Sequence, residues 1–266
     1  MKHDDPSLQS YLDRYANWNR LKTVAITFDV DWAPDYMIRN ALDIIERHDL
    51  RTTFFATHDS ELLREVAAKD RHEVGLHPNL SANSTQGQGI HEIITNLRIY
   101  YPEAHGNRFH ILGMSYRDLL WLGGHSFHYD VSRILFNTPY LVPVWSYDLK
   151  MILLPYMWED GVCENQGLTP SLETIALDSP GLKIINFHPM NVFINCTNQK
   201  DRLAFQRANS DLLNTLEEDA KVFRRKGSGA EQTLENLCHY IAGQGIEAVC
   251  VRDLVKNFPR KLYGIS

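Results

Sequence analysis

Short apolar runs and amphipathic stretches alternate along this chain. Residues 24–28 form a nearly continuous apolar run, which is typical of a strand covered on both faces in a parallel sheet. Residues 34–45 then carry apolar side chains at helical spacing, after a proline placed where a first helical turn accepts one. The same patterns predict further strands at 52–57, 72–77, 107–112, 126–131, 141–145, 183–187 and 247–251. Further helices are predicted at 7–21, 60–69, 90–100, from 115 onward, 201–225 and 231–243.

This alternation of strand and helix predicts a mostly parallel α/β assembly. The number of strands and the lack of a low-complexity linker favour a single distorted (β/α)7–8 barrel over an open sheet. Residues 1–22 are expected to form a helical lead-in, and residues 23–266 to form the barrel domain. With 266 residues, of which 44% are hydrophobic, the chain has enough apolar material for one such core.

Ionisable side chains fall at or near the ends of the predicted strands. Six of them share this position: Asp29, Asp31, His77, Arg108, His110 and His188. The carboxyl ends of the strands of a β/α barrel open onto one face, so these side chains are expected to converge there. Oxygen and imidazole ligands suit zinc or a similar divalent ion.

Each of these residues also has a simpler interpretation. Asp31 could cap the helix that follows it, because aspartate is a common N-cap. A lone histidine at a strand end is more often a hydrogen-bonded loop residue than a metal ligand. Three histidines at strand ends, with two aspartates on another strand, favour a shared site.

Charge and cysteine content limit the classes of partner. The formal net charge of −6 gives no reason to expect nucleic acid or an anionic membrane surface as a partner. The four cysteines contain no C-x-x-C pair, which favours reduced core thiols over a thiolate zinc site. No apolar signal segment follows the N-terminal residues, and the apolar stretch 140–158 is broken by prolines and charges. We therefore expect a cytoplasmic protein without a membrane span.

Four segments together resemble a known family. They are Thr27-Phe-Asp-Val-Asp31, Thr53-Phe-Phe55, His72-Glu-Val-Gly-Leu-His77 and Ile184-Ile-Asn-Phe-His188. In this order and spacing they are similar to the motifs of the polysaccharide deacetylases, the NodB-like group of carbohydrate esterase family 4. The resemblance extends from about residue 23 to about residue 251.

The resemblance implies a role for each matching residue. Asp29 corresponds to the general base, and Arg108 to its hydrogen-bonding arginine. Asp31 and His77 correspond to metal ligands, and His188 to the acid that protonates the leaving group.

The chain departs from the family pattern at one metal ligand. The second metal histidine of the family should lie four residues after His77, where this chain has Ser81. Serine is a poor zinc ligand, so either Asn79 or His110 is expected to take its place. We favour His110, because imidazole is the better ligand.

The resemblance implies a zinc-dependent hydrolase that removes an acetyl group from an N-acetylated sugar in bacterial surface-polysaccharide (O-antigen) biosynthesis. Aromatic residues beside acids suggest that Trp145, Asp148 and Trp158 bind the sugar. Three alternatives stay open: a glycoside hydrolase, a metal-free carbohydrate-binding relative, and a hydrolase of another carbon–nitrogen amide bond. The sequence does not indicate the carrier of the sugar or the oligomeric state.

Overall fold

The computed structural model describes residues 23–256 and 258, and the predicted helical lead-in at 1–22 lies outside that range. The strands are β1 (Thr23–Asp29), β2 (Thr52–Ala56), β3 (Glu73–Leu76), β4 (Gly106–Asn107), β5 (Tyr129–Asp130), β6 (Val144–Ser146), β7 (Met151–Leu153), β8 (Trp158–Glu159), β9 (Ile184–Phe187) and β10 (Glu247–Ala248). The α-helices are α2 (Asp35–Arg47), α3 (Glu61–Ala67), α4 (Gly89–Tyr100), α5 (Tyr116–Gly123), α6 (Asp160–Asn165), α7 (Pro189–Phe193), α8 (Gln199–Ala208), α9 (Glu217–Lys221), α10 (Ala230–Gly243) and α11 (Val251–Lys256). Three short 3₁₀ helices are η1 (His110–Leu112), η2 (Leu172–Thr174) and η3 (Leu212–Asn214).

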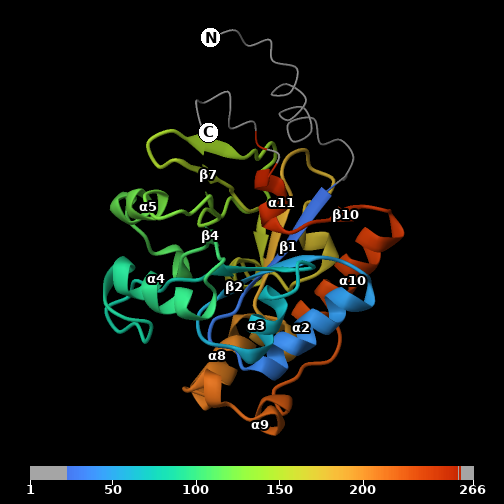
Figure 1. Ribbon diagram of the computed structural model, residues 1–266. Coiled ribbons are helices and arrows are strands. Elements are labelled where there is room, and N and C mark those ends of the chain that lie inside the picture. The colour runs from blue at the N-terminus through green and yellow to red at the C-terminus, as the bar shows by residue number, and fades with distance from the viewer. Residues whose placement is uncertain (1–22, 257, 259–266) are drawn as a thin grey trace.

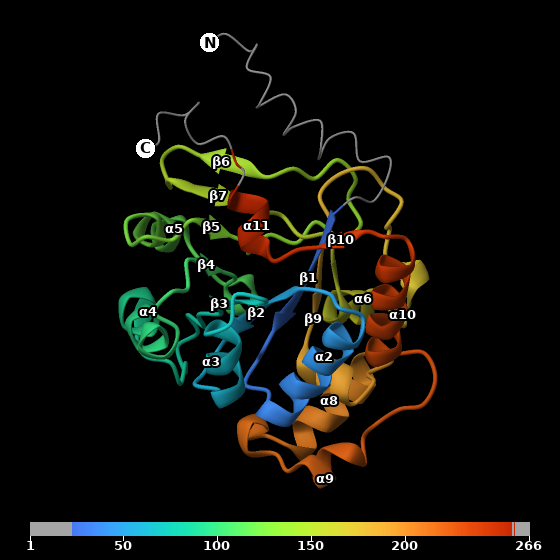
Figure 2. The same ribbon diagram turned by 45° about the vertical axis from the view of Figure 1, so that its right-hand side comes forward.

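The strands form one curled sheet in the order β6-β7-β5-β4-β3-β2-β1-β9-β8, and β10 pairs with the start of β1 (Figures 1 and 2). All pairs are parallel except β6 with β7. A parallel bridge between Ile134 and Tyr156 joins the segment after β5 to the segment before β8. The sheet therefore curls into a distorted barrel of mostly parallel strands, which confirms the predicted fold class.

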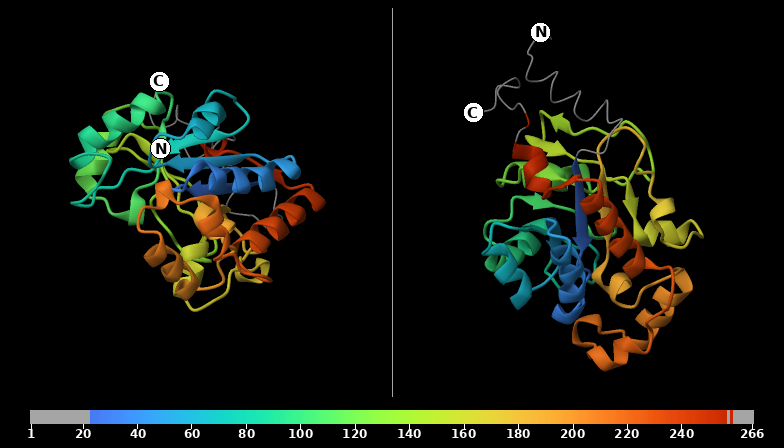
Figure 3. Two further views of the ribbon diagram at one scale, coloured as in Figure 1. Left: turned by 90° about the horizontal axis from the view of Figure 1, so that it is seen from below. Right: turned by 90° about the vertical axis from the view of Figure 1, so that its right-hand side faces the viewer.

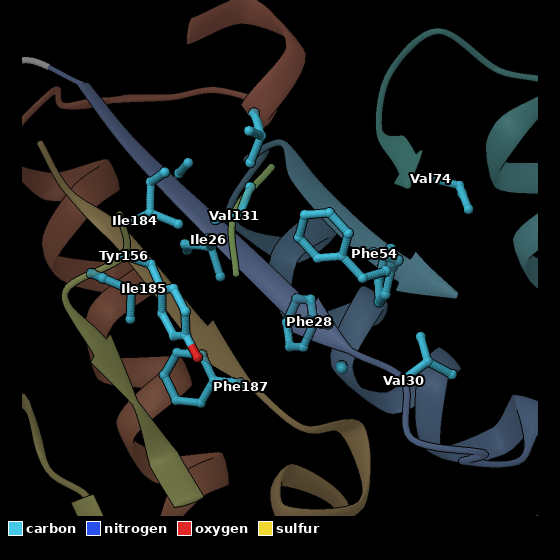
Figure 4. Packing of buried hydrophobic residues seen from close by; sticks show 14 of the residues in the cluster. Ile26, Phe28, Val30, Phe54, Val74, Val131, Tyr156, Ile184, Ile185 and Phe187 are labelled. Carbon is cyan, nitrogen blue, oxygen red and sulfur yellow. The ribbon is translucent and has the colours of Figure 1, made fainter. Parts of the chain in front are cut away.

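The central strand β1 is buried along its whole length. The ring of Phe28 stacks on Phe54 of β2, with centroids 4.9 Å apart, and tilts against Phe187 of β9 at 6.2 Å (Figure 4). Burying one such side chain stabilises the fold by about 1.5–3 kcal/mol. The apolar runs of the sequence thus become the layer between the sheet and its helices.

Helices cover the outside of the barrel. Helix α2 buries the apolar stripe that the sequence predicted and packs against α7 and α10 (Figure 3). Helix α5 begins at a capping box, in which Ser115 and Asp118 bond each other's backbone N–H groups. No helix within the described residues is long and apolar enough to cross a membrane.

The predicted fourth strand, 107–112, is largely wrong. Strand β4 covers only Gly106–Asn107, and the chain turns into η1 at His110. The N–H of Phe109 donates to the Ser132 hydroxyl and that of His110 to the Pro78 carbonyl, so neither extends a ladder. This turn moves His110 off the strand, toward the loop that follows β3.

Other boundaries also differ from the predictions. Strands β7 and β8 were not predicted, and the predicted strand at 141–145 is the antiparallel edge strand β6. The predicted helix at 201–225 is divided into α8, η3 and α9. Helix α8 buries a single apolar side chain, Phe205, so no continuous apolar stripe holds a longer helix against the core.

Glycine at position 106 is required by a close approach of two strands. A Cβ there would overlap the ring of Tyr129, which is fully buried and donates a hydrogen bond to Glu73. We expect Gly106→Ala to lower the free energy of unfolding by about 1–3 kcal/mol, measured by urea denaturation.

Gly243→Ala is the matched control, because a Cβ at the end of α10 meets no neighbouring atom. This variant should be as stable as the parent protein or gain up to about 1 kcal/mol. Equal stability of the Gly106→Ala variant and the parent would contradict the packing at β4.

Candidate functional site

The chain makes an unusual turn at the carboxyl end of β1. The strand ends at Asp29, and Asp31 and Trp32 both adopt left-handed backbone conformations, with φ of 47° and 57°. The Trp32 N–H donates to the Thr57 hydroxyl at 2.9 Å, which ties the turn to the end of β2. Left-handed conformations are disfavoured for most side chains, so the turn is held by its contacts. It directs the two carboxylates to different partners, not to one face of an extended strand.

Asp31 lies between two imidazoles. One of its carboxylate oxygens is 2.9 Å from Nδ1 of His110 and 3.1 Å from Nε2 of His77. The two ring nitrogens are 3.4 Å from each other. One ligand atom from each residue lies within 4.8 Å of the others, close enough for one ion to contact all three.

The orientation of His77 is fixed by its second nitrogen. Nδ1 is 2.6 Å from the Arg108 carbonyl oxygen, which can only accept, so Nδ1 carries the proton. Nε2 therefore faces Asp31 with a lone pair when the ring is neutral, as is usual for a metal-binding histidine.

This arrangement shifts the pKa values of Asp31 and His77 in opposite directions. Burial would raise the pKa of Asp31, but hydrogen bonds to His110 and His77 and the charge of His188 hold that pKa well below its usual range. Burial would lower the pKa of His77, but the charges of Asp29 and Asp31 outweigh burial and raise it. In the absence of a cation the cluster thus binds protons, and a metal ion can replace them.

Asp29 has a separate set of partners. Its Oδ1 accepts a hydrogen bond from Nη1 of Arg108 at 2.9 Å, and its Oδ2 accepts one from Nδ2 of Asn186 at 3.0 Å. The Arg108 guanidinium is fully buried between the rings of Phe55 and Tyr156, at 4.6 and 4.3 Å from their centroids. The Asp29 carboxylate is therefore held in one orientation by two side chains, one from the segment after β4 and one from β9.

His188 lies on the other side of Asp31. Its Nε2 is 3.6 Å from Asp31 Oδ2, and its Nδ1 is 2.6 Å from Oδ1 of the fully buried Asp160. The second oxygen of Asp160 accepts the backbone N–H of His188 at 2.9 Å. Burial would lower the pKa of His188, but the charge and hydrogen bond of Asp160, with the charges of Asp31 and Glu159, raise that pKa well above its usual range.

Asp31, His110 and His188 border a cleft of about 740 Å³ at the carboxyl ends of the strands. Its walls include Asp31, Trp32, His110 and His188, and residues 202–213 form the facing side. This volume is within the range of small-ligand sites. A second hollow of about 770 Å³ lies at the opposite ends of β3 and β5 and is lined by none of the six predicted site residues.

The structure brings together the six ionisable residues that the sequence placed at strand ends. Asn79 lines the cleft, but its side-chain oxygen already accepts the Ser81 N–H at 3.0 Å, and Ser81 is exposed. His110, the favoured replacement for the missing family histidine, lies within reach of Asp31 and His77.

The three residues predicted to bind sugar lie away from the cleft. Trp145 and Asp148 lie on and beside β6, at the far end of the barrel from α8 and α9 (Figure 2). Trp158 is fully buried with its ring 5.1 Å from that of Phe187, so it has no exposed face for a sugar. The sequence shows which aromatic residues lie beside acids, but it does not show which end of the barrel these residues occupy.

Three neighbours of the site have contacts with it that the sequence did not predict. Asp160 holds His188, Asn186 bonds Asp29, and Trp32 lines the cleft with its ring edge-on to His110 at 5.1 Å. The available signal for Asn186 was a single polar residue within the apolar strand 184–187. Trp32 directly follows the aspartate motif, where a large aromatic residue is unexpected in a turn.

Comparison with known proteins identifies the family to which this chain belongs. A family model described as WbmS-like polysaccharide deacetylase matches residues 26–204. This span includes the six ionisable residues that the sequence placed at strand ends. The chain therefore belongs to the polysaccharide deacetylases and, among them, to the WbmS-like family. This membership confirms the resemblance to the NodB-like group.

Solved structures support the same fold. WbmS of Bordetella bronchiseptica, assigned as a polysaccharide deacetylase involved in O-antigen biosynthesis, has a TM-score of 0.73 and 24% identity, covering 86% of this chain and 92% of that one. The Bc1960 peptidoglycan N-acetylglucosamine deacetylase has a TM-score of 0.50 and 15% identity, covering 94% and 97%. No curated protein matches this chain.

The contact between Asp160 and His188 allows a test of the electrostatics. In metal-free protein, Asp160→Asn should lower the pKa of His188, because the largest favourable charge is removed. NMR titration of the His188 ring measures this pKa. Asp43→Asn, on the exposed side of α2, is the control and should leave it unchanged.

The same contact affects stability with a defined sign. The pKa of His188 is raised in the folded state, so its stabilising effect is complete below the unfolded value of about 6.5 and is lost as pH rises through the folded value. The difference in unfolding free energy between parent and Asp160→Asn should therefore shrink at high pH. A constant difference across that range would contradict the assignment.

Proposed function

We propose that this chain is a metal-dependent hydrolase that removes an acetyl group from an N-acetylated sugar. The observation that supports this most is the cluster of Asp31, His77 and His110, which borders a cleft through Asp31 and His110 and has Asp29 and His188 as direct neighbours. Family membership supplies the deacetylase class. The site supplies residues of the right chemistry for each step.

The cluster fits a divalent cation, most readily zinc. It offers one carboxylate oxygen and two imidazole nitrogens, which is a common ligand set for catalytic zinc. His77 is held for this purpose by the carbonyl of Arg108. A cation bound here would act as a Lewis acid toward an acyl oxygen and make water more acidic.

Asp29 is the proposed general base. Its carboxylate lies beside the cluster, 3.9 Å from Nδ1 of His77, and Arg108 and Asn186 fix its orientation. It would accept the proton of the water that attacks the acetyl carbonyl. Correct positioning of a base contributes about 10²–10⁴-fold to the rate.

His188 is the proposed general acid. Asp160 holds the proton-bearing Nδ1, which leaves Nε2 directed toward Asp31 and the cleft. Protonated at Nε2, the ring would donate that proton to the departing sugar amine. Asp160 does not touch the substrate and acts by positioning His188.

The proposed substrate is an N-acetylated sugar used in the assembly of a bacterial surface polysaccharide. The support is the similarity to WbmS, which is assigned to O-antigen biosynthesis. Trp32, at the cleft wall, is the aromatic side chain best placed to pack against a sugar ring. A cytoplasmic location and a single barrel domain stay predictions.

Metal content tests the first part of the proposal. We expect His110→Ala to lose at least about 100-fold in zinc affinity, because changes even around a ligand lose 10–100-fold. Competition with a chelator, followed by elemental analysis, measures this affinity. Asn79→Ala is the control and should keep it, since the Asn79 side chain is already engaged by Ser81.

If His110→Ala retains zinc and Asn79→Ala loses it, the third metal ligand is Asn79 and not His110. If the parent protein takes up no divalent metal at all, the hydrolase proposal fails and the carbohydrate-binding alternative is favoured.

Activity tests the second part. Asp29→Asn should retain zinc and lose about 10²–10⁴-fold in acetate release from N-acetylated sugars, because only the proton acceptor is removed. Acetate is measured by a coupled assay, and circular dichroism checks that the variant folds. Unchanged turnover in the folded, zinc-loaded variant would refute the role of Asp29.

A further inference from the structure

Asn191 has an unusual environment at the cleft. It lies on the short helix α7, three residues after His188, and is one of the residues that line the cleft. It is only 1% exposed. Within the described residues, neither its Nδ2 nor its Oδ1 has a hydrogen-bonding partner. A buried amide with both polar atoms unpaired is rare in folded proteins.

A structural role does not explain this side chain. Asn195, four residues later, is also buried, and both of its polar atoms are paired. Its Nδ2 donates to the carbonyls of Arg225 and Gly227, and its Oδ1 accepts backbone N–H groups at the start of α10. Asn195 thus shows a buried asparagine that stabilises this fold with both polar atoms of its amide in use. An apolar side chain at 191 would avoid the desolvation penalty.

We propose that Asn191 forms a sugar subsite that binds two adjacent hydroxyl groups of the ring carrying the acetamido group. An amide side chain presents one acceptor and donors side by side. Two neighbouring hydroxyls offer the complementary pair, one donating to Oδ1 and the other accepting from Nδ2. The acetamido group cannot do this, because its N–H and C=O point in opposite directions. This inference rests on the proposed function, since it assumes a sugar in the cleft.

The location of Asn191 supports this assignment. His188, the residue directly before α7, is the proposed proton donor to the sugar amine. A side chain three residues further along the same element is therefore placed near the ring that bears this amine. Because the amide is covered in the free protein, binding requires the neighbouring cleft side chains to shift. Arg202, Gln206 and Leu212 line the facing wall, and rotamer changes of this kind are common on binding.

The inference predicts opposite effects on stability and on binding. Asn191→Leu, a change of similar volume, should raise the melting temperature by about 2–4 °C, because an unpaired buried amide is removed. Asn195→Leu is the matched control and should lower it, because four hydrogen bonds are lost. A fall for Asn191→Leu would overturn the inference, since it would reveal a structural role.

Sugar binding is the second measurement. The zinc-loaded protein is titrated calorimetrically with N-acetylglucosamine, N-acetylgalactosamine and their 3-deoxy analogues. The parent protein should bind at least one of the two N-acetylated sugars about 10-fold tighter than the 3-deoxy analogue of that sugar. The Asn191→Leu variant should bind the sugar and its analogue with equal affinity. Equal discrimination by both proteins, or no binding of any probe by the parent, would overturn the inference.

The two proposals fail in different ways. If the parent protein binds the sugar with this discrimination but releases no acetate, the subsite stands and the hydrolase proposal falls. If acetate is released but Asn191→Leu binds and discriminates as the parent does, the hydrolase proposal stands and the subsite falls.

Discussion

The guanidinium of Arg108 is the group on which the site and much of the barrel interior depend. It extends from the segment after β4 to Thr27 and Asp29 on β1 and to Asn186 on β9. The carbonyl of the same residue orients His77. Removing one partner of such a buried charge pair typically destabilises a protein by about 3–5 kcal/mol, because the other charge is left unpaired. The geometry of the site is therefore enforced by interactions that the fold itself needs.

The two aspartates of one motif have different surroundings. Asp29 is enclosed by an arginine and an amide, whereas Asp31 is partly open to the cleft and faces three imidazoles. The left-handed turn at Asp31 and Trp32 separates them. Two carboxylates whose environments differ in this way are typical of sites that divide proton transfer from charge stabilisation.

Much of the fold was predictable because burial leaves a periodic signal. Strands β1, β2 and β9 are largely apolar runs, and α2 and α10 carry apolar stripes, so their positions follow from local sequence. Strands of two or three residues, such as β7 and β8, leave no such signal. The break between α8 and α9 follows from missing contacts with the core, which a local pattern does not reveal.

The site was predictable to the extent that strand ends share one face of a barrel. His110 was expected on a strand but reaches the cluster through a 3₁₀ turn, because its backbone bonds the loop after β3. The interaction of Asp160 with His188 joins residues 28 positions apart, and nothing near either residue indicates it. The position of Trp145 at the far end of the barrel and the burial of Trp158 are tertiary properties too, which aromatic residues beside acids in the sequence do not reveal.

A crystal structure of the zinc-loaded protein, with anomalous scattering at the zinc edge, shows directly whether the three side chains bind a cation. We expect one zinc ion about 2.0–2.2 Å from an Asp31 carboxylate oxygen, from Nε2 of His77 and from Nδ1 of His110, at the mouth of the cleft. An anomalous peak bound by other side chains, or none between these three, would contradict it.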